Sequence, residues 1–152
     1  MLKKELVLSW KNEIQIGKII NEELKSIPES IQIMGEPGRF LAGSAGCLIT
    51  QAVGLATRDD KHWLYLDTGF YGGLMEIAQK FPLKIVSQKT GNVEPWTLAG
   101  PTCDSVDVLG DHALPSNIEV EDILFVPNLG AYCTTCACDF NGFPVPEIVL
   151  TD

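Results

Sequence analysis

The sequence contains two short polar segments whose side chains could bind a charged ligand. In the first, residues 36–39 (Glu-Pro-Gly-Arg), the guanidinium of Arg39 could hold a phosphate or carboxylate through two parallel hydrogen bonds. Gly38 would allow a backbone N–H to approach that anion closely, and Glu36 could accept a hydrogen bond from a protonated ring nitrogen. The same four residues could instead form a turn with an ordinary Glu–Arg ion pair.

The second segment, residues 100–105 (Gly-Pro-Thr-Cys-Asp-Ser), places a cysteine beside an acid in a loop that contains glycine and proline. The thiol of Cys103 could exchange a proton with a bound substrate, and the carboxylate of Asp104 could bind a cation. A buried cysteine within a turn is the alternative interpretation of the same residues.

Three further cysteines form a Cys-x-x-Cys-x-Cys run of the kind that can bind a metal: Cys133, Cys136 and Cys138. A structural zinc site needs four ligands, and the two histidines, His62 and His112, lie far away in the sequence. We therefore predict no metal site and interpret these thiols as small buried side chains.

Aromatic residues on either side of the cysteine run could contribute to a binding site. The phenol of Tyr132 could donate a hydrogen bond to a phosphate, and Phe140 could form one wall of a pocket. Packing in the core is the alternative for both. The sequence has no Walker loop, no GxGxxG and no GxSxG motif, so nucleotide-binding and serine-hydrolase sites of these kinds are not indicated.

The elements that must position these residues change in type along the chain. Residues 12–27 carry isoleucine and leucine at helical spacing, which predicts a helix that ends before Pro28. The apolar residues 31–34 predict a short buried strand that leads into the Glu-Pro-Gly-Arg segment. A helix, a strand and a polar turn are typical of one unit of an α/β barrel or sheet, where ligands bind at the carboxyl ends of strands.

From residue 39 onward the pattern is that of a β domain. Short apolar runs alternate with Gly, Pro, Asn and Asp, as in β-barrels and sandwiches, and a short helix is predicted at residues 72–80. We therefore predict a mainly β fold, in which residues 1–38 are the remnant of an α/β unit and residues 39–152 are the β domain. The predicted strands are residues 40–57, 63–66, 83–86, 96–98, 106–109, 123–126 and 148–150.

Composition limits the class of protein. The chain has 152 residues, of which 45% are hydrophobic and 20% charged, enough to bury a core. A net charge of −9 argues against a nucleic-acid or anionic-membrane binder, and no apolar run is long enough to span a bilayer. The N-terminal residues lack the pattern of a signal peptide, and five cysteines without a regular framework indicate reduced thiols, so we predict a cytoplasmic protein.

Charge is unevenly distributed along the sequence. After Lys89 there is no lysine or arginine, although acidic residues continue to Asp152. Solubility explains most of these acids. Some of them could instead form a surface or site that faces a cationic ligand or a basic partner domain, and charge alone leaves both interpretations open.

Four segments carry a pattern when they are taken together and in order: GEPGRF (35–40), WLYLDTGFYGGLME (63–76), GPTCDSVDVL (100–109) and GAYCTTCACDFNGFPVPEI (130–148). They are similar to the C-terminal part of the fold-type-III pyridoxal-phosphate decarboxylases, which act on ornithine, lysine, arginine or diaminopimelate. The family combines an N-terminal (β/α)8 barrel with a C-terminal β-barrel domain like that of alanine racemase. The resemblance therefore implies that residues 1–38 hold the last helix and strand of that barrel.

The resemblance implies roles at the cofactor. Glu36 would pair with the pyridine nitrogen of pyridoxal phosphate and keep it protonated. Gly38 and Arg39 would hold the phosphate, with help from Tyr132. A protonated pyridine ring accepts the electrons left on Cα when carbon dioxide departs, which is why a carboxylate belongs beside its nitrogen.

For the substrate, the resemblance implies that Cys103 delivers a proton to Cα after carbon dioxide leaves and that Asp104 binds the distal ammonium. Phe140 would line the same pocket. The Cys-Asp-Ser sequence favours ornithine, lysine or arginine, since the diaminopimelate enzymes are similar to Cys-Glu-Ser at this place. Many eukaryotic relatives carry a substrate-binding Asp where this chain has Thr68, whereas here the acid is one position earlier, at Asp67.

The resemblance also implies partners. In this family the loop with Cys103 and Asp104 reaches across a head-to-tail homodimer into the partner's active site, and the Schiff-base lysine lies in the N-terminal barrel. No lysine of this sequence lies in a matching motif, so we expect the chain to be inactive alone and to bind the cofactor only with the barrel portion. The implied function is that of a carboxy-lyase for a basic amino acid in polyamine biosynthesis; the alternative is a non-catalytic, decarboxylase-like module for regulation or dimerisation.

Overall fold

The computed structural model describes residues 14–151, which belong to two compact units. The first unit ends at Glu36 and the second begins at Pro37. Every strand of the described residues lies in the second unit. Within residues 14–151, no helix is both long enough and apolar enough to cross a membrane.

The first unit contains one helix, at residues 14–24, followed by turns around Pro28. The N–H groups of Lys25, Ser26 and Ile27 each donate to a carbonyl three residues earlier, so the chain tightens before the proline stops it. The helix therefore ends earlier than the sequence predicts, and residues 12 and 13 of that prediction lie outside the described residues.

The strand predicted at residues 31–34 is wrong. These residues pair with no strand within residues 14–151, and they are exposed. An apolar run becomes a strand only where its backbone N–H and C=O groups find a neighbouring strand. No such neighbour exists in the described part of this chain.

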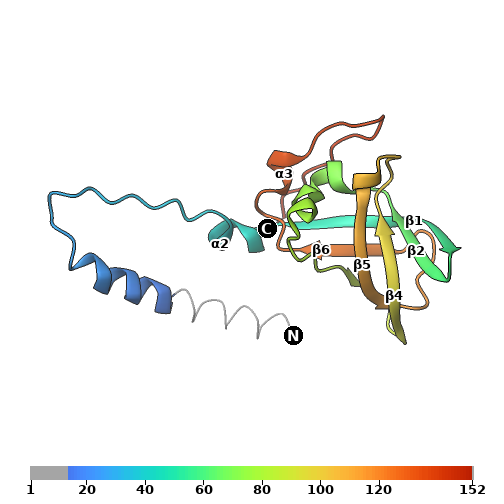
Figure 1. The fold of residues 1–152 in the computed structure, drawn as a ribbon, viewed down its shortest axis with the longest axis horizontal. Helices are drawn as coiled ribbons and strands as arrows, with labels where there is room; N and C mark the ends of the chain where they lie inside the picture. Colours follow the sequence, from blue (N-terminus) through green and yellow to red (C-terminus); the bar gives the residue numbers. More distant parts are fainter. Residues whose placement is uncertain (1–13, 152) are drawn as a thin grey trace. The chain divides into compact units, whose positions relative to one another are not determined.

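The second unit is built on one six-stranded sheet (Figure 1). The strand order is β3-β6-β1-β2-β4-β5, and all neighbours are antiparallel except β2 and β4, which are parallel. The sheet curls, so that β4 and β5 run across the direction of β1 and β6 (Figure 1). This confirms the mainly β fold. The strands are β1 (Cys47–Arg58), β2 (Lys61–Leu66), β3 (Val86–Ser87), β4 (Val93–Ala99), β5 (Val108–Pro115) and β6 (Ile123–Pro127).

Strand β1 joins the two halves of the curled sheet. Its first half pairs with β6 as far as Gln51, and its second half pairs with β2 from Ala52 onward. The register shifts between Ala52 and Gly54, so Val53 is the extra residue of a bulge. A bulge bends the strand and increases its twist, so one long strand can pair with both halves of the curled sheet.

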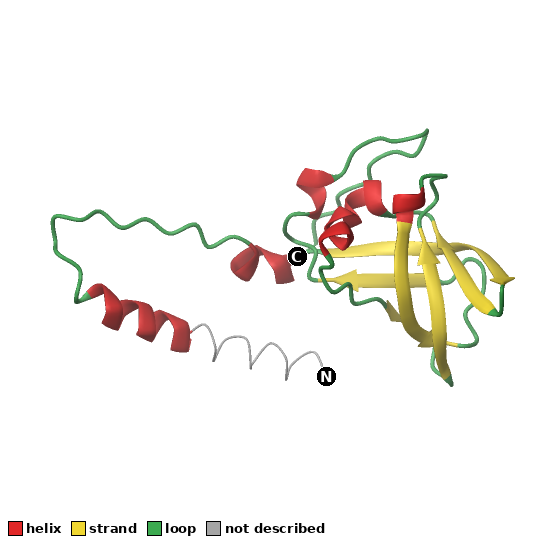
Figure 2. Cartoon of the chain, viewed as in Figure 1, coloured by secondary structure: helices red, strands yellow, loops and turns green. Residues whose placement is uncertain are grey.

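Short helical turns gather at one end of the sheet (Figure 2). Among them, η2 contacts η3, η4 and α3. It thereby brings together segments that are far apart in the sequence. The turns are α2 (Arg39–Ala42), η1 (Gly43–Ala45), η2 (Phe70–Leu74), η3 (Met75–Gln79), η4 (Ser105–Asp107) and α3 (Cys133–Cys136).

Other predicted strands also differ from the structure. The strand predicted at residues 83–86 is β3 at Val86–Ser87, and the strand predicted at residues 106–109 is β5 at Val108–Pro115, because residues 105–107 form η4. The strand predicted from residue 40 begins only at Cys47, because residues 39–45 form helical turns that hydrogen bonds to the loop after β6 hold in place. The N–H of Leu129 donates to Gly46 O, and that of Gly130 donates to Gly43 O. The strand predicted at residues 148–150 is absent, and these residues are exposed.

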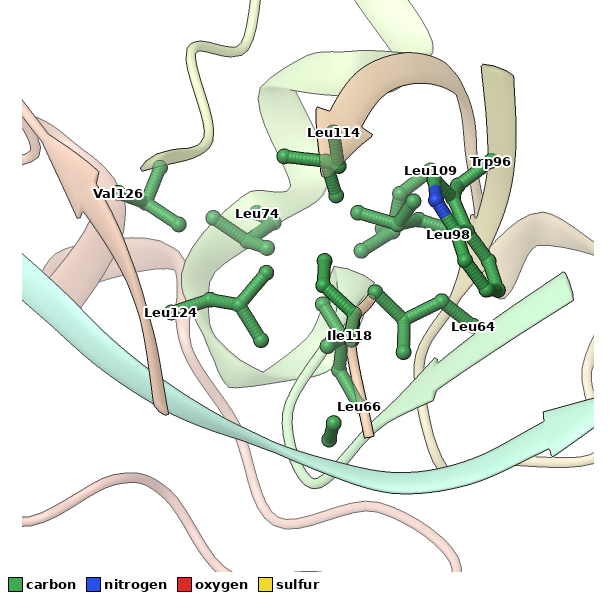
Figure 3. Packing of buried hydrophobic residues seen from close by; sticks show 11 residues of the cluster. Leu64, Leu66, Leu74, Trp96, Leu98, Leu109, Leu114, Ile118, Leu124 and Val126 are labelled. Carbon is green, nitrogen blue, oxygen red and sulfur yellow. The ribbon is translucent and has the colours of Figure 1, made fainter. Parts of the chain in front are cut away.

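The core fills the concave side of the sheet and is closed by η2. Leu64, Leu98 and Leu124 are fully buried, and they come from β2, β4 and β6. Leu74 of η2 packs against the same cluster (Figure 3). Apolar side chains from both halves of the sheet therefore share one core, and the helical end is attached to it through Leu74 and through the partly buried Ile77 of η3. The remaining members are Ala52, Leu66, Trp96, Leu109, Leu114, Ile118 and Val126.

The Leu98→Ala substitution tests this core. It removes a fully buried side chain of β4 from the core, so we expect the free energy of unfolding to fall by about 3 kcal/mol. Leu150→Ala makes the same change at a side chain that is 93% exposed and is expected to have almost no effect. Urea unfolding followed by circular dichroism measures both, and equal effects would contradict the described core.

Candidate functional site

Most of the residues singled out in the sequence form two groups on the second unit. One group surrounds Arg39 at the start of α2, and the other surrounds Asp104 at the start of η4. Glu36 is the last residue of the first unit and is exposed.

The guanidinium of Arg39 is half-buried and is held by three segments. Its Nη1 donates to the carbonyl of Ala131 (2.6 Å), and its Nη2 forms an ion pair with Glu76 of η3. The same group lies 4.4 Å above the ring of Phe81 and 5.2 Å from the ring centroid of Tyr132. These contacts fix the cation, yet they use only some of its five N–H donors, so others remain for an anion.

The close approach of Tyr132 to Gly38 needs a glycine at that position. A Cβ on Gly38 would overlap the Tyr132 hydroxyl. The phenol and the backbone of residue 38 thus lie next to Arg39, with the Tyr132 side chain exposed. A peptide N–H, a phenol and a guanidinium at one place are hydrogen-bond donors of the kind that bind phosphate.

The second group is organised by the carboxylate of Asp104. Its Oδ1 accepts a hydrogen bond from the N–H of Val106 (3.0 Å), which caps η4. Its Oδ2 accepts a hydrogen bond from the Tyr71 hydroxyl (2.6 Å), which comes from η2. Both oxygens are therefore held, one by the neighbouring Val106 and the other by Tyr71, which lies 33 residues before Asp104 in the sequence.

These bonds change the acidity of both partners. The hydrogen bond to Asp104 raises the pKa of Tyr71 to about 12. The same bond, together with that from the Val106 N–H, lowers the pKa of the Asp104 carboxyl. The bonds thus stabilise the fold at pH above the ordinary pKa of an aspartate, and this contribution is lost as the pH falls through the lowered pKa.

A tight turn brings Phe140 and Asn141 against this group. Phe140 and Phe143 exchange backbone hydrogen bonds across Asn141 and Gly142, whose φ angles are 52° and 87°. Both positions are left-handed, which suits an Asn-Gly pair. The ring of Phe140 stacks on Tyr71 with 3.8 Å between centroids, and the Asn141 amide Nδ2 lies 3.2 Å from the Sγ of Cys103.

An open groove of about 800 Å³ lies beside this loop. Cys103, Asp104 and Asp67 line it, together with Phe143 rather than Phe140. The Oδ1 of Asp67 accepts hydrogen bonds from the Thr50 hydroxyl (2.6 Å) and the Gln51 N–H (2.9 Å), so this acid also ties β1 to the end of β2. The other residues that line the groove are Val53, Arg58, Trp63, Tyr65, Ala99, Gly100, Pro101, Thr102, Asp107 and Val108.

Sequence reasoning missed Asp107, which holds the two loops of this site together. Its side chain is 1% exposed. Its Oδ1 accepts from the N–H of Phe70 (2.7 Å), and its Oδ2 accepts from the N–H (3.0 Å) and the hydroxyl (2.7 Å) of Thr102. A Cβ on Gly69 or Gly100 would overlap this carboxylate, so the two glycines are the signal in the sequence that could have located it.

The cysteines of the Cys-x-x-Cys-x-Cys run differ in burial. Cys133 is buried, and desolvation raises the pKa of its thiol. Cys136 is partly buried and Cys138 is exposed, so the interpretation of all three as buried side chains holds for Cys133 alone. Among the described residues, no cluster of His, Cys, Asp or Glu could hold a metal ion.

Comparison with known proteins places the chain in a family. A family model described as "Pyridoxal-dependent decarboxylase, C-terminal sheet domain" matches residues 7–130. The lysine/ornithine decarboxylase of Selenomonas ruminantium is 34% identical over 137 residues, which cover 88% of this chain and 34% of that protein. The chloroplastic ornithine decarboxylase of Nicotiana glutinosa is 32% identical over 149 residues, covering 90% and 34%.

Solved structures of decarboxylases match this chain at a similar level of sequence identity. The lysine/ornithine decarboxylase of Vibrio vulnificus, complexed with cadaverine, matches with a TM-score of 0.78 at 35% identity, over 88% of this chain and 37% of that one. The arginine decarboxylase of Paramecium bursaria Chlorella virus, bound to agmatine, matches with a TM-score of 0.74 at 31% identity, over 82% and 36%. The chain spans about a third of the length of the curated relatives it matches.

The Asp107→Asn substitution tests the buried carboxylate. An amide NH2 group cannot accept the hydrogen bonds that one carboxylate oxygen now receives, so a buried donor loses its partner. We expect the free energy of unfolding to fall by about 2–3 kcal/mol. Asp111→Asn is the matched control, because Asp111 is exposed and accepts one hydroxyl hydrogen bond from Thr97. Thermal unfolding compares the two variants with the unsubstituted chain. An Asp107→Asn variant as stable as the unsubstituted chain would show that the carboxylate does not hold the two loops together.

Proposed function

Because the chain belongs to the pyridoxal-dependent decarboxylases, as their C-terminal sheet domain, we propose that it completes the active site of an enzyme that decarboxylates a basic amino acid. Ornithine, lysine and arginine are the candidate substrates, and the reaction would form a diamine or agmatine for polyamine synthesis. The observation that carries the proposal is the pair of Cys103 and Asp104 at the wall of one open groove, with both Asp104 oxygens oriented by hydrogen bonds.

The substrate's distal ammonium is assigned to Asp104. Its lowered pKa keeps the carboxylate charged at neutral pH, and each oxygen has a second lone pair available beyond the bond it already accepts. Asp67 lines the same groove and adds a second negative charge toward a cation. A basic amino acid fits this groove better than a substrate whose far end carries a carboxylate.

The proton that replaces carbon dioxide is assigned to Cys103. Its side chain is exposed at the groove, and the amide of Asn141 points at its sulfur. In this assignment the Sγ thiol donates its proton to the substrate Cα, while the acid beside it holds the far end of the same molecule. One loop would thus contact both ends of the substrate.

The residues around Arg39 fit the phosphate of pyridoxal phosphate. The guanidinium keeps free N–H donors, and the Tyr132 hydroxyl stands where a side chain on Gly38 would otherwise be. Gly38, Arg39 and Tyr132 would hold the phosphate, and Glu36 would accept a hydrogen bond from the protonated pyridine nitrogen. Pyridoxal phosphate supplies an acceptor for the electrons left on Cα when carbon dioxide leaves.

The rest of the active site is assigned to residues outside the 152 of this sequence. We propose that an N-terminal barrel portion supplies the lysine that binds the cofactor, and that the loop with Cys103 and Asp104 serves the partner subunit of a head-to-tail homodimer. The chain alone would then release no carbon dioxide. Five free cysteines are consistent with a reducing, cytoplasmic location.

Reconstitution tests this proposal. The barrel portion of the Vibrio vulnificus lysine/ornithine decarboxylase, with its own C-terminal domain deleted, is coexpressed with this chain. We expect the two to copurify and to release carbon dioxide from lysine or ornithine when pyridoxal phosphate is added, while neither part does so alone. Failure to copurify, activity of the chain by itself, or a stable complex without activity would each contradict the proposal; the last result favours a regulatory module.

Within the reconstituted enzyme, Asp104→Asn tests the substrate assignment. Loss of the charge that faces the ammonium should lower kcat/KM by about 10- to 100-fold. The control is Asp60→Asn in the exposed turn between β1 and β2, where φ is 60° and asparagine is well tolerated. Steady-state assays of carbon dioxide release compare the two variants. An unchanged kcat/KM in Asp104→Asn would show that Asp104 does not bind the substrate ammonium.

A further inference from the structure

We propose that Tyr71 is a positioning residue that orients the Asp104 carboxylate toward the distal ammonium of the substrate. That Asp104 binds the substrate ammonium rests on the proposed function. That Tyr71 orients Asp104 rests on the geometry of η2, η4 and the turn at residues 140–143. Tyr71 lies within the matching segment 63–76, but the sequence analysis assigned it no role.

The orientation follows from the two hydrogen bonds that Asp104 accepts. The N–H of Val106 holds Oδ1 at 3.0 Å and the Tyr71 hydroxyl holds Oδ2 at 2.6 Å, so rotation about the Cβ–Cγ bond would break at least one of them. Removing the hydroxyl leaves a single anchor, and the carboxylate becomes free to turn away from the groove. Fixed orientation lowers the cost of binding because little side-chain freedom remains to be lost.

The hydroxyl of Tyr71 is itself fixed in place. Its ring stacks on Phe140 with 3.8 Å between centroids and an interplanar angle of 12°, and it meets the edge of Phe70 at 5.2 Å. Its backbone carbonyl accepts a hydrogen bond from the N–H of Cys138 (3.0 Å). Phe140 is held in turn by its exchange of hydrogen bonds with Phe143. The phenol is therefore a rigid support for the acid.

A neutral donor suits this role better than a cation. A lysine or arginine at position 71 would hold the carboxylate equally well, but it would neutralise the charge that must attract the ammonium. The phenol has a pKa of about 12 and stays protonated at neutral pH, so it orients Asp104 and leaves its charge intact. The other charged or titratable groups that line the groove are Arg58, Tyr65, Asp67, Cys103 and Asp107, and Cys138 lies near the Tyr71 hydroxyl.

Tyr71→Phe tests the proposal because it removes the hydroxyl and keeps the ring that stacks on Phe140. In the complete 152-residue chain, carboxyl-detected NMR titration should show the pKa of Asp104 rising toward that of an ordinary aspartate. In the reconstituted enzyme, KM for lysine or ornithine should rise about tenfold with kcat changed less than about twofold, as expected for loss of one hydrogen bond to a charged group. The acidic limb of the kcat/KM profile should move to higher pH in step with the Asp104 titration.

Thr97→Val is the matched control. The Thr97 hydroxyl donates to Asp111 Oδ1 at 2.6 Å, the same length as the Tyr71 bond, and neither residue lines the groove. This variant should leave KM, kcat and the Asp104 titration unchanged. A general loss of stability would instead affect both variants.

Two results would overturn the proposal. An Asp104 pKa that is the same in Tyr71→Phe and in the natural chain would show that the hydrogen bond is not made. An unchanged KM, or a fall in kcat at constant KM, would show that the phenol does not position the ammonium site. Absence of activity in the unsubstituted reconstituted enzyme would count against the proposed function alone, because the NMR titration still decides the hydrogen bond.

Discussion

The buried carboxylate of Asp107 is the interaction on which the candidate substrate site depends. It accepts hydrogen bonds from Phe70 at the start of η2 and from Thr102 in the loop before η4. These are the segments that carry Tyr71 and the Cys103–Asp104 pair. A charge that is 1% exposed must be fully hydrogen-bonded to be tolerated, so the two loops close around it in one arrangement. Gly69 and Gly100 make that arrangement possible, since neither has room for a side chain.

The two groups of the site use opposite charges in similar surroundings. Around Arg39 a cation is held by a carbonyl, a carboxylate and aromatic rings, and it keeps donors for an anion. Around Asp104 an anion is held by a peptide N–H and a phenol, and it keeps lone pairs for a cation. The division agrees with the chemistry of a substrate that has an ammonium at one end and a cofactor that carries a phosphate. The long cation-free stretch after Lys89 supplies the acidic half.

Much of the fold could be predicted from the sequence, because apolar runs bounded by Gly, Pro and Asp become strands wherever partners exist. The runs in β2, β4 and β6 are examples. The run at residues 31–34 has the same sequence pattern, but it pairs with no neighbouring strand in the described chain. The local sequence pattern cannot show whether a neighbouring strand is present. The start of β1 was misplaced for a related reason, since the N–H groups of Leu129 and Gly130, far away in the sequence, donate to Gly46 and Gly43 and hold the helical turn before β1.

Chemically distinctive residues of the site, such as Arg39, Cys103 and Asp104, could be selected from type and motif. The residues that hold these side chains in place could not be selected in this way. Tyr71 is one aromatic residue among many, and Asp107 is one acid in an acidic stretch; each acquires a role only when η2 and η4 meet. The Asn-Gly pair at residues 141–142 is a supporting feature with a local signal, because such a pair predicts a tight turn by itself.

Amide hydrogen exchange at Phe70 and Thr102 measures whether the Asp107 carboxylate joins the two loops. Both N–H groups donate to the buried Asp107 carboxylate, although they belong to loops that would otherwise exchange quickly. We expect protection of these two amides comparable to that of the Leu98 amide in β4, and loss of that protection in Asp107→Asn. Exchange at the rate of an exposed loop in the natural chain would contradict this expectation.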